Sequence, residues 1–378
     1  MSSKPYKILA INTGSTSTKL ALYEGEKELF KTDVNIPAES VKQFKLMIDQ
    51  LDLRMEGINA FLKEAGVDVS TLDMIAARGG SINGLHSGAY KVDEHMVTVA
   101  RYAQRSQHAS TLSCCIANRL GEPYGIPAII YDAVAASDAE PLLEKTGVPG
   151  VNRFITCHML NQRMVGREVA AKLGKPYEEC NFVIAHMGGG ITIGCHSGGK
   201  VIDTVLDDAG PMSPQRAGRL PVTSVINMCF EEGQTKLSMQ SRVRGNAGIV
   251  AYFGTEDVRI IEKRIEEGDQ EAKDIYWLMS YQLAKSIAEL AVPLKGKVDA
   301  VILTGGIAYS KMFTQWVKEQ VDWLAPVEIV PGEREMLALM RGATRVLDGE
   351  EEAKDYRWLP DGCENLEQLV EQSKNLWK

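Results

Sequence analysis

One pattern occurs twice in this chain and limits the folds that it can adopt: an apolar strand, a glycine-containing turn and a second apolar strand. The first copy is residues 8–23, ILAINTGSTSTKLALY, and the second is residues 182–195, FVIAHMGGGITIGC. Each copy is followed by a further turn and a further predicted strand, at 28–35 and at 201–207. Solenoid repeats recur every ~20–50 residues, a period much shorter than this one. The sequence therefore predicts two halves of related design, each beginning with a three-stranded meander.

The two turns have the composition of an anion site. The first, Asn12–Lys19, contains five hydroxyl side chains and a lysine, and main-chain N–H groups in such a turn form a concavity that binds anions. Taken alone, this stretch is typical of an ordinary β-hairpin with a polar tip. The second turn contains three consecutive glycines, Gly188–Gly190, directly after His186-Met187. Two such hairpins facing one another across a cleft suit a polyphosphate held from two sides.

Bulk composition narrows the class of protein. A chain of 378 residues, 44% hydrophobic and 24% charged, is typical of a globular protein with two domains. The net charge of −8 argues against nucleic-acid binding, which requires a basic surface. No apolar run approaches the ~20 residues of a membrane span, and the N-terminal stretch lacks the apolar region of a signal peptide. The seven cysteines are scattered without a C-x-x-C motif, which favours reduced thiols in a cytoplasm over disulfides or a zinc site.

Alternating strands and helices along the chain predict sheets that are covered by helices. Helices are expected at 41–62, 97–120, 152–173, 222–232, 250–267, 271–291, from about 310 onwards, and at 336–347. Buried strands are expected at 72–77, 128–131, 300–303 and 327–330, in addition to the meanders. The residues beyond 350 are expected to form either a surface segment or a helix that packs back on the first domain.

Two common nucleotide-binding motifs are absent. The chain has no G-x-x-x-x-G-K-[ST] loop, which excludes a P-loop protein, and no G-x-G-x-x-G that opens a helix after a strand, which argues against a dinucleotide fold. A third glycine turn, Gly305-Gly306, follows an apolar strand and leads into a predicted helix. N–H groups at such a position favour an anion or a closely approaching nucleotide. Together, the three turns favour a phosphate-binding protein.

Four further residues are candidates for a role in binding or chemistry. Arg78 directly follows a buried strand, and Arg216 lies in a loop rich in proline and glycine. An isolated arginine is most often a surface charge, but two arginines that converge on one site suit a carboxylate and a phosphate. Asp132 ends a buried strand and is explained equally well as a turn residue. His158 lies on a predicted helix, where a hydrogen-bonded structural histidine is the commoner explanation.

Two acidic residues, Glu333 and Glu335, follow the last predicted strand. Carboxylates at the start of a helix are stabilised by its dipole, and this explanation competes with a metal-binding role. The residues alone do not choose between the two glutamates.

A series of motifs resembles a known family. The segments INTGSTSTK, AARGG, IIYDAVAASD, AHMGGGIT, GPMSPQRAGRLP, LTGGIAYS and PGEREMLAL, in this order, resemble the butyrate kinases. That family belongs to the acetokinase group, in the superfamily of actin, sugar kinases and heat-shock ATPases. The resemblance covers residues 7–350 and implies an α/β fold of duplicated ribonuclease H-like (actin-like ATPase) domains around a central cleft. It implies an N-terminal domain at 1–150, a nucleotide-binding domain at 151–347, and a tail at 348–378 that packs back on the first domain.

The resemblance also implies roles for individual residues. Arg78, Asp132, His158 and Arg216 match catalytic residues: the arginines hold the acid and the transferring phosphoryl group, the histidine hydrogen-bonds that group, and the aspartate is tied to magnesium. A larger set matches positions that bind the nucleotide and its phosphates: Asn12, Gly14, Ser15, Thr16, Lys19, His186, Gly188, Gly189, Gly190, Gly305 and Gly306. Asn12, Asp132 and Glu335 match the positions that hold the metal, with Glu333 as a competitor of Glu335.

The implied reaction is the reversible, ATP- and Mg²⁺-dependent phosphorylation of a short-chain fatty acid, butyrate or a branched analogue, to an acyl phosphate. A carboxyl group with a pKa of ~4 is already ionised at neutral pH, so the reaction depends on positioning and charge neutralisation rather than on a general base. The alternatives are an acetate or propionate kinase and, within the same superfamily, a sugar or polyol kinase or an assembly ATPase. A cytoplasmic homodimer or higher homo-oligomer is expected, with neither nucleic acid nor membrane as a partner.

Overall fold

The computed structural model describes residues 5–14, 17–37, 39–40, 43–44, 46–102 and 108–376. The chain forms two compact units. The first combines Met1–Ser137 with Arg334–Lys378, and the second is Asp138–Glu333. Among the described residues, no helix combines the length and the apolar character that crossing a membrane requires.

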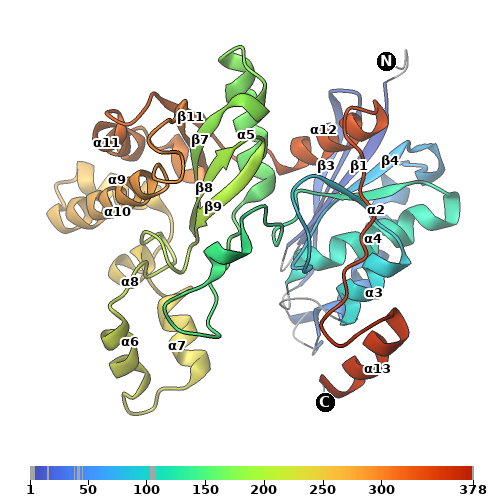
Figure 1. The fold of residues 1–378 in the computed structure, drawn as a ribbon, viewed down its shortest axis with the longest axis horizontal. Coiled ribbons are helices and arrows are strands. Elements are labelled where there is room, and N and C mark those ends of the chain that lie inside the picture. Colours follow the sequence, from blue (N-terminus) through green and yellow to red (C-terminus); the bar gives the residue numbers. More distant parts are fainter. Residues whose placement is uncertain are drawn as a thin grey trace. The chain divides into compact units, whose positions relative to one another are not determined.

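The first unit is built on a mixed sheet of six strands in the order β3-β2-β1-β4-β6-β5 (Figure 1). Its strands are β1 (Lys7–Thr13), β2 (Ser17–Glu24), β3 (Lys27–Asn35), β4 (Met74–Arg78), β5 (Ala89–Lys91) and β6 (Ala128–Tyr131). The first three form the antiparallel meander, β4 runs parallel to β1, and β6 runs parallel to β4. Residues 8–11 of β1 are fully buried, so this strand is covered on both faces.

The second unit repeats this arrangement with five strands in the order β11-β10-β7-β8-β9. Its strands are β7 (Asn181–Met187), β8 (Ile191–Ser197), β9 (Lys200–Val205), β10 (Ala300–Gly305) and β11 (Val327–Pro331). The first three again form an antiparallel meander, with β10 parallel to β7 and β11 parallel to β10. The two sheets therefore share one strand order, and β5 is an additional edge strand of the first. The predicted duplication and the α/β fold class are confirmed.

Five α-helices carry most of the described helical structure of the first unit. They are α2 (Leu51–Glu64), α3 (Glu94–Tyr102), α4 (Leu112–Gly121), α12 (Glu335–Leu347) and α13 (Leu366–Leu376). Both α4 and α12 pack against β1 and β4, and α13 packs against α3 (Figure 1). The contacts of α12 explain why the chain returns to the first unit near residue 334, although the sequence analysis assigned residues up to 347 to the second domain.

The helices of the second unit cover both faces of its sheet. They are α5 (Met159–Lys172), α6 (Val222–Cys229), α7 (Lys236–Val243), α8 (Ile249–Phe253), α9 (Val258–Glu266), α10 (Gln270–Glu289) and α11 (Lys311–Val321). Alternate residues of β7 point to opposite sides, because Val183 and Ala185 join a core with α10 and α11, whereas Phe182 and Ile184 join a core with α5. Helix α10 begins after Asp269, whose carboxylate accepts a hydrogen bond from the N–H of Ala272 at 3.0 Å.

Three predicted helices are shorter or divided. The helix expected at 41–62 begins with a 3-10 turn at Met47–Gln50 and continues as α2, while its first residue, Val41, lies outside the described residues. The helix expected at 97–120 is two helices, α3 and α4, and residues 103–107 are not described. The helix expected at 250–267 is divided between α8 and α9 because Gly254 has a left-handed backbone (φ 72°) and Asp257 caps a new helix.

The helix expected at 152–173 begins only at Met159, so the prediction of a helical His158 is wrong. His158 is the residue before the first helical turn, and its main-chain N–H donates to Thr192 Oγ1 at 3.2 Å. The preceding Arg153 bonds to the carbonyl oxygen of Leu143 and to the carboxylate of Asp203, at 2.7 and 2.5 Å, which holds this stretch extended.

Candidate active site

In the first unit, three predicted site residues come from the same edge of the sheet. Strands β1, β4 and β6 are parallel, with Ile11 paired to Ala77 and Arg78 paired to Tyr131. The carboxyl ends of these strands therefore lie together, and each is followed or closed by a polar residue: Asn12, Arg78 and Asp132. Ligands bind at this edge in open α/β sheets.

Asn12, Arg78 and Glu335 form one hydrogen-bonded cluster. The buried amide of Asn12 donates through Nδ2 to Glu335 Oε2 at 2.6 Å, and Arg78 Nη1 donates to Asn12 Oδ1 at 3.3 Å. Arg78 Nη2 lies 3.2 Å from Glu335 Oε1, which makes a forked ion pair. Nε of Arg78 is buried, and no described residue accepts a hydrogen bond from it. A buried N–H without an acceptor is uncommon in proteins and indicates a position where a ligand or water binds.

Asp132 has an uncommon backbone conformation and is held by hydrogen bonds to Gly88. It has a left-handed φ of 44°, which is uncommon for a residue other than glycine, and its carboxylate accepts a hydrogen bond from the N–H of Gly88 at 2.8 Å. The main-chain N–H of Asp132 in turn donates a hydrogen bond to the carbonyl oxygen of Gly88, at 3.1 Å. The side chain is 2% exposed. The buried carboxylate lies at the edge of the sheet where ligands bind in such folds, while its backbone conformation is one that aspartate also adopts in ordinary turns.

The first glycine hairpin connects β1 to β2 beside this cluster. Asn12 and Lys19 are directly opposite one another in the ladder and therefore lie on the same face of the sheet. At the turn, the N–H of Gly14 donates to the carbonyl oxygen of Ser17 at 2.8 Å, and the hydroxyl of Thr13 bonds to Ser113 at the start of α4 at 2.6 Å. Ser15 and Thr16, predicted to bind phosphate, lie outside the described residues.

In the second unit, His158 and His186 are stacked. Their ring centroids are 4.0 Å apart and the ring planes differ by 9°. His186 is the sixth residue of β7, and its Nδ1 lies 3.0 Å from Asn161 Nδ2 on α5. Its Nε2 lies 3.7 Å from the half-exposed Glu333, so the two competing glutamates belong to different clusters. The hydroxyl oxygen of Thr192, on β8, lies 2.8 Å from Nδ1 of His158.

The triple glycine at the tip of the second hairpin packs against the loop that carries Arg216. The carbonyl oxygen of Gly189 accepts hydrogen bonds from Ser213 Oγ at 2.7 Å and from the N–H of Gln215 at 3.0 Å. A Cβ on Gly190 would lie 2.9 Å from Oδ2 of Asp207. That carboxylate is the partner of Arg216, whose Nε donates to Oδ2 at 2.9 Å.

Arg216 keeps part of its guanidinium available. Besides the bond to Asp207, its Nη1 donates to the carbonyl oxygen of Gln215 at 3.2 Å. Its Nη2 has no hydrogen-bond acceptor among the residues that the structure describes. Asp207 is shared with a second arginine, Arg244, whose Nη2 lies 3.0 Å from Oδ2. The sequence analysis identified Arg216 but missed Asp207, Arg244 and Thr192, because no local motif marks them.

The third glycine turn lies at the end of β10, next to the second hairpin. Gly305 has a left-handed φ of 87°, and a Cβ there would lie 2.5 Å from the carbonyl oxygen of Met187, so this close approach requires glycine. Gly305 and Gly332 exchange main-chain hydrogen bonds of 3.3 and 3.0 Å. A Cβ on Gly306, by contrast, would have no neighbour within 4 Å, which leaves open space at this turn.

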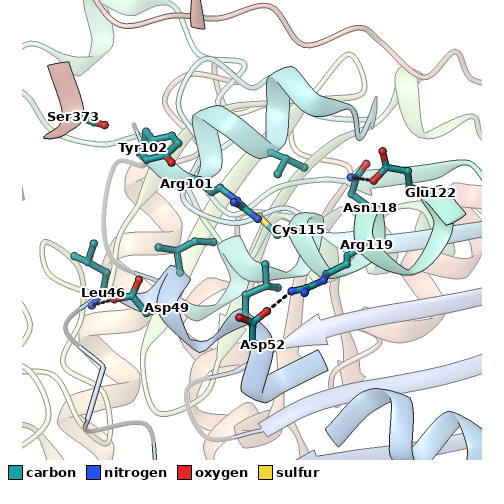
Figure 2. A pocket seen from close by; sticks show the side chains of 13 residues that line it. Leu46, Asp49, Asp52, Arg101, Tyr102, Cys115, Asn118, Arg119, Glu122 and Ser373 are labelled. Carbon is teal, nitrogen blue, oxygen red and sulfur yellow. Dashed lines mark hydrogen bonds and ion pairs between the residues drawn. The ribbon is translucent and has the colours of Figure 1, made fainter. Parts of the chain in front are cut away.

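A separate cavity of about 800 Å³ lies in the first unit, away from all these residues. It is lined by residues of α2, α3 and α4 among others, including the ion pair of Asp52 with Arg119. Figure 2 shows Arg101 directed at the sulfur of Cys115 inside it. None of the predicted site residues lines this cavity.

Comparisons with known proteins agree with the fold and with these motifs. Residues 144–327 match the model of the Acetokinase family. A probable butyrate kinase of Clostridium botulinum (strain Alaska E43 / Type E3) is 42% identical over 353 residues, which is 93% of this chain and 99% of that relative. Butyrate kinase 2 of Clostridium acetobutylicum is 39% identical over 354 residues, again 93% of this chain and 99% of the relative. The chain belongs to the butyrate kinases of the acetokinase family.

Solved structures of acetokinases share the fold. The acetate kinase of Porphyromonas gingivalis aligns with a TM-score of 0.73 at 18% identity, covering 90% of this chain and 99% of that one. A propionate kinase of Francisella tularensis aligns with a TM-score of 0.68 at 16% identity, covering 89% and 98%. At these identities the likeness concerns the fold alone, and it confirms duplicated domains of the actin-like ATPase kind for this butyrate kinase family member.

Proposed function

We propose that this chain transfers the γ-phosphoryl group of ATP to the carboxylate of a short-chain fatty acid, butyrate or a branched analogue, and catalyses the reverse reaction. The observation that carries the proposal is that each predicted arginine lies beside a predicted phosphate-binding hairpin. Arg78 contacts Asn12 of the first hairpin, and Arg216 is held by Asp207, which lies against Gly190 of the second. Membership in the butyrate kinases supports the same reaction and favours butyrate over acetate or propionate.

The chemistry follows from charge. A carboxylate attacking a phosphoryl group brings several negative charges together, so catalysis depends on donors that neutralise them and on an in-line geometry. Arg78 offers an unpaired buried Nε, and Arg216 offers Nη2. We assign the acid and the transferring phosphoryl group to these two arginines, and a hydrogen bond to that phosphoryl group to His158. Each arginine is already held in place by a carboxylate, Arg78 by Glu335 and Arg216 by Asp207. This contact lowers the entropic cost of ordering the arginine side chain when a ligand binds.

The hairpins are assigned to the nucleotide. Under this proposal, the phosphate-binding residues of the first unit are Asn12, Gly14, Ser15, Thr16 and Lys19. Those of the second unit are His186, Gly188, Gly189 and Gly190. Gly305 and Gly306 are assigned to the adenosine side, and the lack of any heavy atom within 4 Å of a Cβ on Gly306 agrees with a ligand that approaches this turn.

The residues around Glu335 fit a magnesium ion held mainly by phosphates. Mg²⁺ prefers carboxylate and amide oxygens and usually keeps one or two protein ligands with several waters. Glu335 and Asn12 supply such oxygens next to one another, and Asp132 supplies a carboxylate at the same sheet edge. Among the described residues, no group of three or more acidic, histidine or cysteine side chains could hold a metal ion by itself. The ion would neutralise charge on the transferring phosphate.

Two further expectations stay predictions. All seven cysteines are free, and five of them are buried, which supports a cytoplasmic location. A homo-oligomer is supported by the apolar side chains of Val222 and Ile226 on α6 and of Phe230 directly after it, which are 74%, 51% and 86% exposed.

An acid panel tests the proposed reaction. Purified protein is incubated with ATP, Mg²⁺ and acetate, propionate, butyrate, isobutyrate or valerate, and the acyl phosphate is trapped as a hydroxamate. We expect product with butyrate or isobutyrate above that with acetate. ATP consumption with glucose or glycerol, without any acid-dependent hydroxamate, would overturn the proposal.

The arginine assignment has its own test. We expect Arg216→Ala to lower kcat by ~10²–10³, the cost typical of one lost transition-state donor. Arg219→Ala is the matched control, because Arg219 lies in the same loop but pairs with the exposed Glu289. Near-normal turnover of Arg216→Ala would contradict the assignment.

A further inference from the structure

A buried chain of hydrogen bonds runs from His158 into the interior of the second unit. The hydroxyl of Thr192 lies 2.8 Å from Nδ1 of His158 and 3.2 Å from Nε2 of Gln162. The amide oxygen of Gln162 lies 3.1 Å from Nε2 of His196, and Nδ1 of His196 lies 2.7 Å from the hydroxyl of Tyr177. Thr192, Gln162, His196 and Tyr177 are each at most 4% exposed.

The alternation of β8 builds this chain. Ile191, Ile193 and Cys195 point into the core under α10 and α11, so the residues between them point to the opposite face of the sheet. Those residues are Thr192, Gly194 and His196. A Cβ on Gly194 would lie 2.3 Å from Oε1 of Gln162 and 2.8 Å from Nε2 of His196. Glycine at this position therefore makes room for the Gln162–His196 hydrogen bond.

The direction of each bond at the inner end can be assigned. Gln162 Nε2 also lies 3.2 Å from the carbonyl oxygen of Thr192, which can only accept a hydrogen bond. The amide NH₂ of Gln162 therefore faces Thr192, and its oxygen faces His196. It follows that Nε2 of His196 donates to this oxygen and Nδ1 accepts from Tyr177.

A neutral His196 is required for this pattern, and its surroundings favour one. Burial, and after it the charges of Arg163 and Arg167, lowers the pKa of His196 to about 3. The neutral imidazole has one donor and one acceptor nitrogen, as the two neighbours of His196 demand.

The outer end of the chain then fixes the tautomer of His158. A hydroxyl has one hydrogen to donate and two lone pairs that accept. The hydroxyl of Thr192 accepts from Nε2 of Gln162 and from the main-chain N–H of His158, both at 3.2 Å. Both lone pairs are used, so its hydrogen goes to Nδ1 of His158. The proton of a neutral His158 ring is therefore on Nε2.

The stacked neighbour is held in the same way. The hydroxyl of Thr304 lies 3.3 Å from the carbonyl oxygen of Gly332, to which it donates, and accepts from Nδ2 of Asn161 at 3.2 Å. The same NH₂ group donates to Nδ1 of His186 at 3.0 Å, which leaves the proton of His186 on Nε2 as well. The ring centroids are 4.0 Å apart, a distance at which neutral imidazoles stack without the repulsion of like charges.

We propose that Thr192 and Gln162 are positioning residues that hold His158 as its neutral Nε2–H tautomer, so that this N–H donates to the transferring phosphoryl group. The opposite tautomer presents a lone pair at Nε2, which repels a phosphoryl oxygen. The role in phosphoryl transfer rests on the proposed function, whereas the tautomer itself is a property of the free protein.

Nuclear magnetic resonance of the ¹⁵N-histidine-labelled protein tests the tautomer without any substrate. Spectra are recorded at about pH 8, above the ordinary histidine pKa of about 6.5, and His158→Gln identifies the signals of His158. We expect a protonated Nε2 and an unprotonated Nδ1 on this ring. In Thr192→Val, which keeps the shape of the side chain and removes the hydroxyl, we expect a mixture of tautomers. A protonated Nδ1 in the unmodified protein overturns the proposal.

Kinetics test the consequence for catalysis. We expect Thr192→Val to lower kcat about tenfold or more, a loss typical of removing the partner that orients a functional histidine, with the KM for ATP unchanged. Thr192→Ser restores the hydroxyl and most of the rate. Thr314→Val is the matched control, because Thr314 is 3% exposed in the same unit and donates to the carbonyl oxygen of Ser310.

The outcomes separate the two proposals. An enzyme that phosphorylates no acid contradicts the proposed function, and the spectra still decide the tautomer. An active Thr192→Val variant with an unchanged kcat and unchanged His158 signals overturns the positioning role. Should Thr192→Val fail to fold, the spectrum of the unmodified protein alone remains decisive for the tautomer.

Discussion

Glu333 and Glu335 are two residues apart and differ in every physical respect that bears on a metal site. Glu335 is 9% exposed, accepts from the amide of Asn12 at 2.6 Å and pairs with Arg78 at 3.2 Å. The side chain of Glu333 is 50% exposed and lies 3.7 Å from His186. A buried carboxylate with a fixed orientation has already lost the conformational freedom that metal or phosphate binding would otherwise remove. This contrast favours Glu335 as the acid linked to magnesium.

Neutralising each glutamate tests this choice. We expect Glu335→Gln to lower kcat by ~10²–10³, because the cluster with Arg78 and Asn12 loses its negative charge while its shape is kept. Glu333→Gln should change kcat by no more than a few-fold. Hydroxamate formation is measured for both variants over a range of Mg²⁺ concentrations, with circular dichroism to confirm that both are folded. A larger loss in Glu333→Gln than in Glu335→Gln would falsify the assignment.

At the scale of elements, the second hairpin and the loop of Arg216 form one packed structure. The three glycines of the hairpin contribute differently. A Cβ added to Gly189 would lie 2.9 Å from Oε1 of Gln215, and a Cβ added to Gly190 would lie 2.9 Å from Oδ2 of Asp207. From Gly188 the nearest atoms are 3.7 Å away, an ordinary van der Waals contact. Two of the glycines therefore serve the contact with the loop, in addition to any role toward phosphate.

This difference predicts unequal effects of the same substitution. We expect Gly190→Ala to move the carboxylate of Asp207 and with it the guanidinium of Arg216, which lowers kcat by about tenfold or more through lost orientation. Gly188→Ala keeps the main-chain N–H groups assigned to phosphate and brings a Cβ no closer than 3.7 Å to its neighbours, so its loss of kcat should be smaller than that of Gly190→Ala. Steady-state kinetics with ATP and butyrate compare the two variants. Equal losses in both would show that the hairpin needs glycine for a reason other than its contact with Asp207.

The sequence predicted an element correctly where a single local pattern determines its type and its ends. Strand β6 was expected at 128–131 and is found there, because a four-residue apolar run bounded by polar residues and proline is unambiguous. The break between α8 and α9 was missed because a left-handed Gly254 is not separable in sequence from a glycine tolerated inside a helix. Arg78 and Arg216 were identified from strand ends and motifs. Thr192 and Gln162 were missed because their partners are 30 or more residues away in the chain.

At the scale of the whole molecule, the C-terminal residues complete the first unit. The main chain of Lys354 donates to the carbonyl oxygen of Ala89 at 3.0 Å and accepts from the N–H of Lys91 at 2.9 Å, so it pairs with the edge strand β5. Tyr356 is 1% exposed, and its hydroxyl donates to the carbonyl oxygen of Asn83 at 2.7 Å. The residues after α12 therefore cover an edge of the first sheet.

From the sequence alone, this segment could be either a surface segment or a helix that packs back on the first domain. Its contacts join residues that are more than 260 positions apart, and no periodic pattern records them. In the structure, Lys354 pairs with the edge strand β5, and α13 packs on α3. A segment of this kind contributes to stability as a core side chain does, because it removes apolar area from water and satisfies the edge hydrogen bonds.

Truncating Tyr356 tests whether the first unit depends on this segment. We expect Tyr356→Ala to destabilise the first unit by ~3–5 kcal/mol, the cost typical of deleting a buried aromatic side chain, and Tyr356→Phe to cost ~1 kcal/mol for the lost hydrogen bond. Hydrogen exchange resolved by peptide should show faster exchange in β1, β4 and β6 and unchanged exchange in β7 and β10, because each unit has its own core. Tyr124→Ala is the control, since that tyrosine is 57% exposed in the same unit. An equal increase of exchange in β7 and β10 would show that the two units unfold together. Unchanged exchange in β4 would show that the C-terminal segment does not stabilise the first unit.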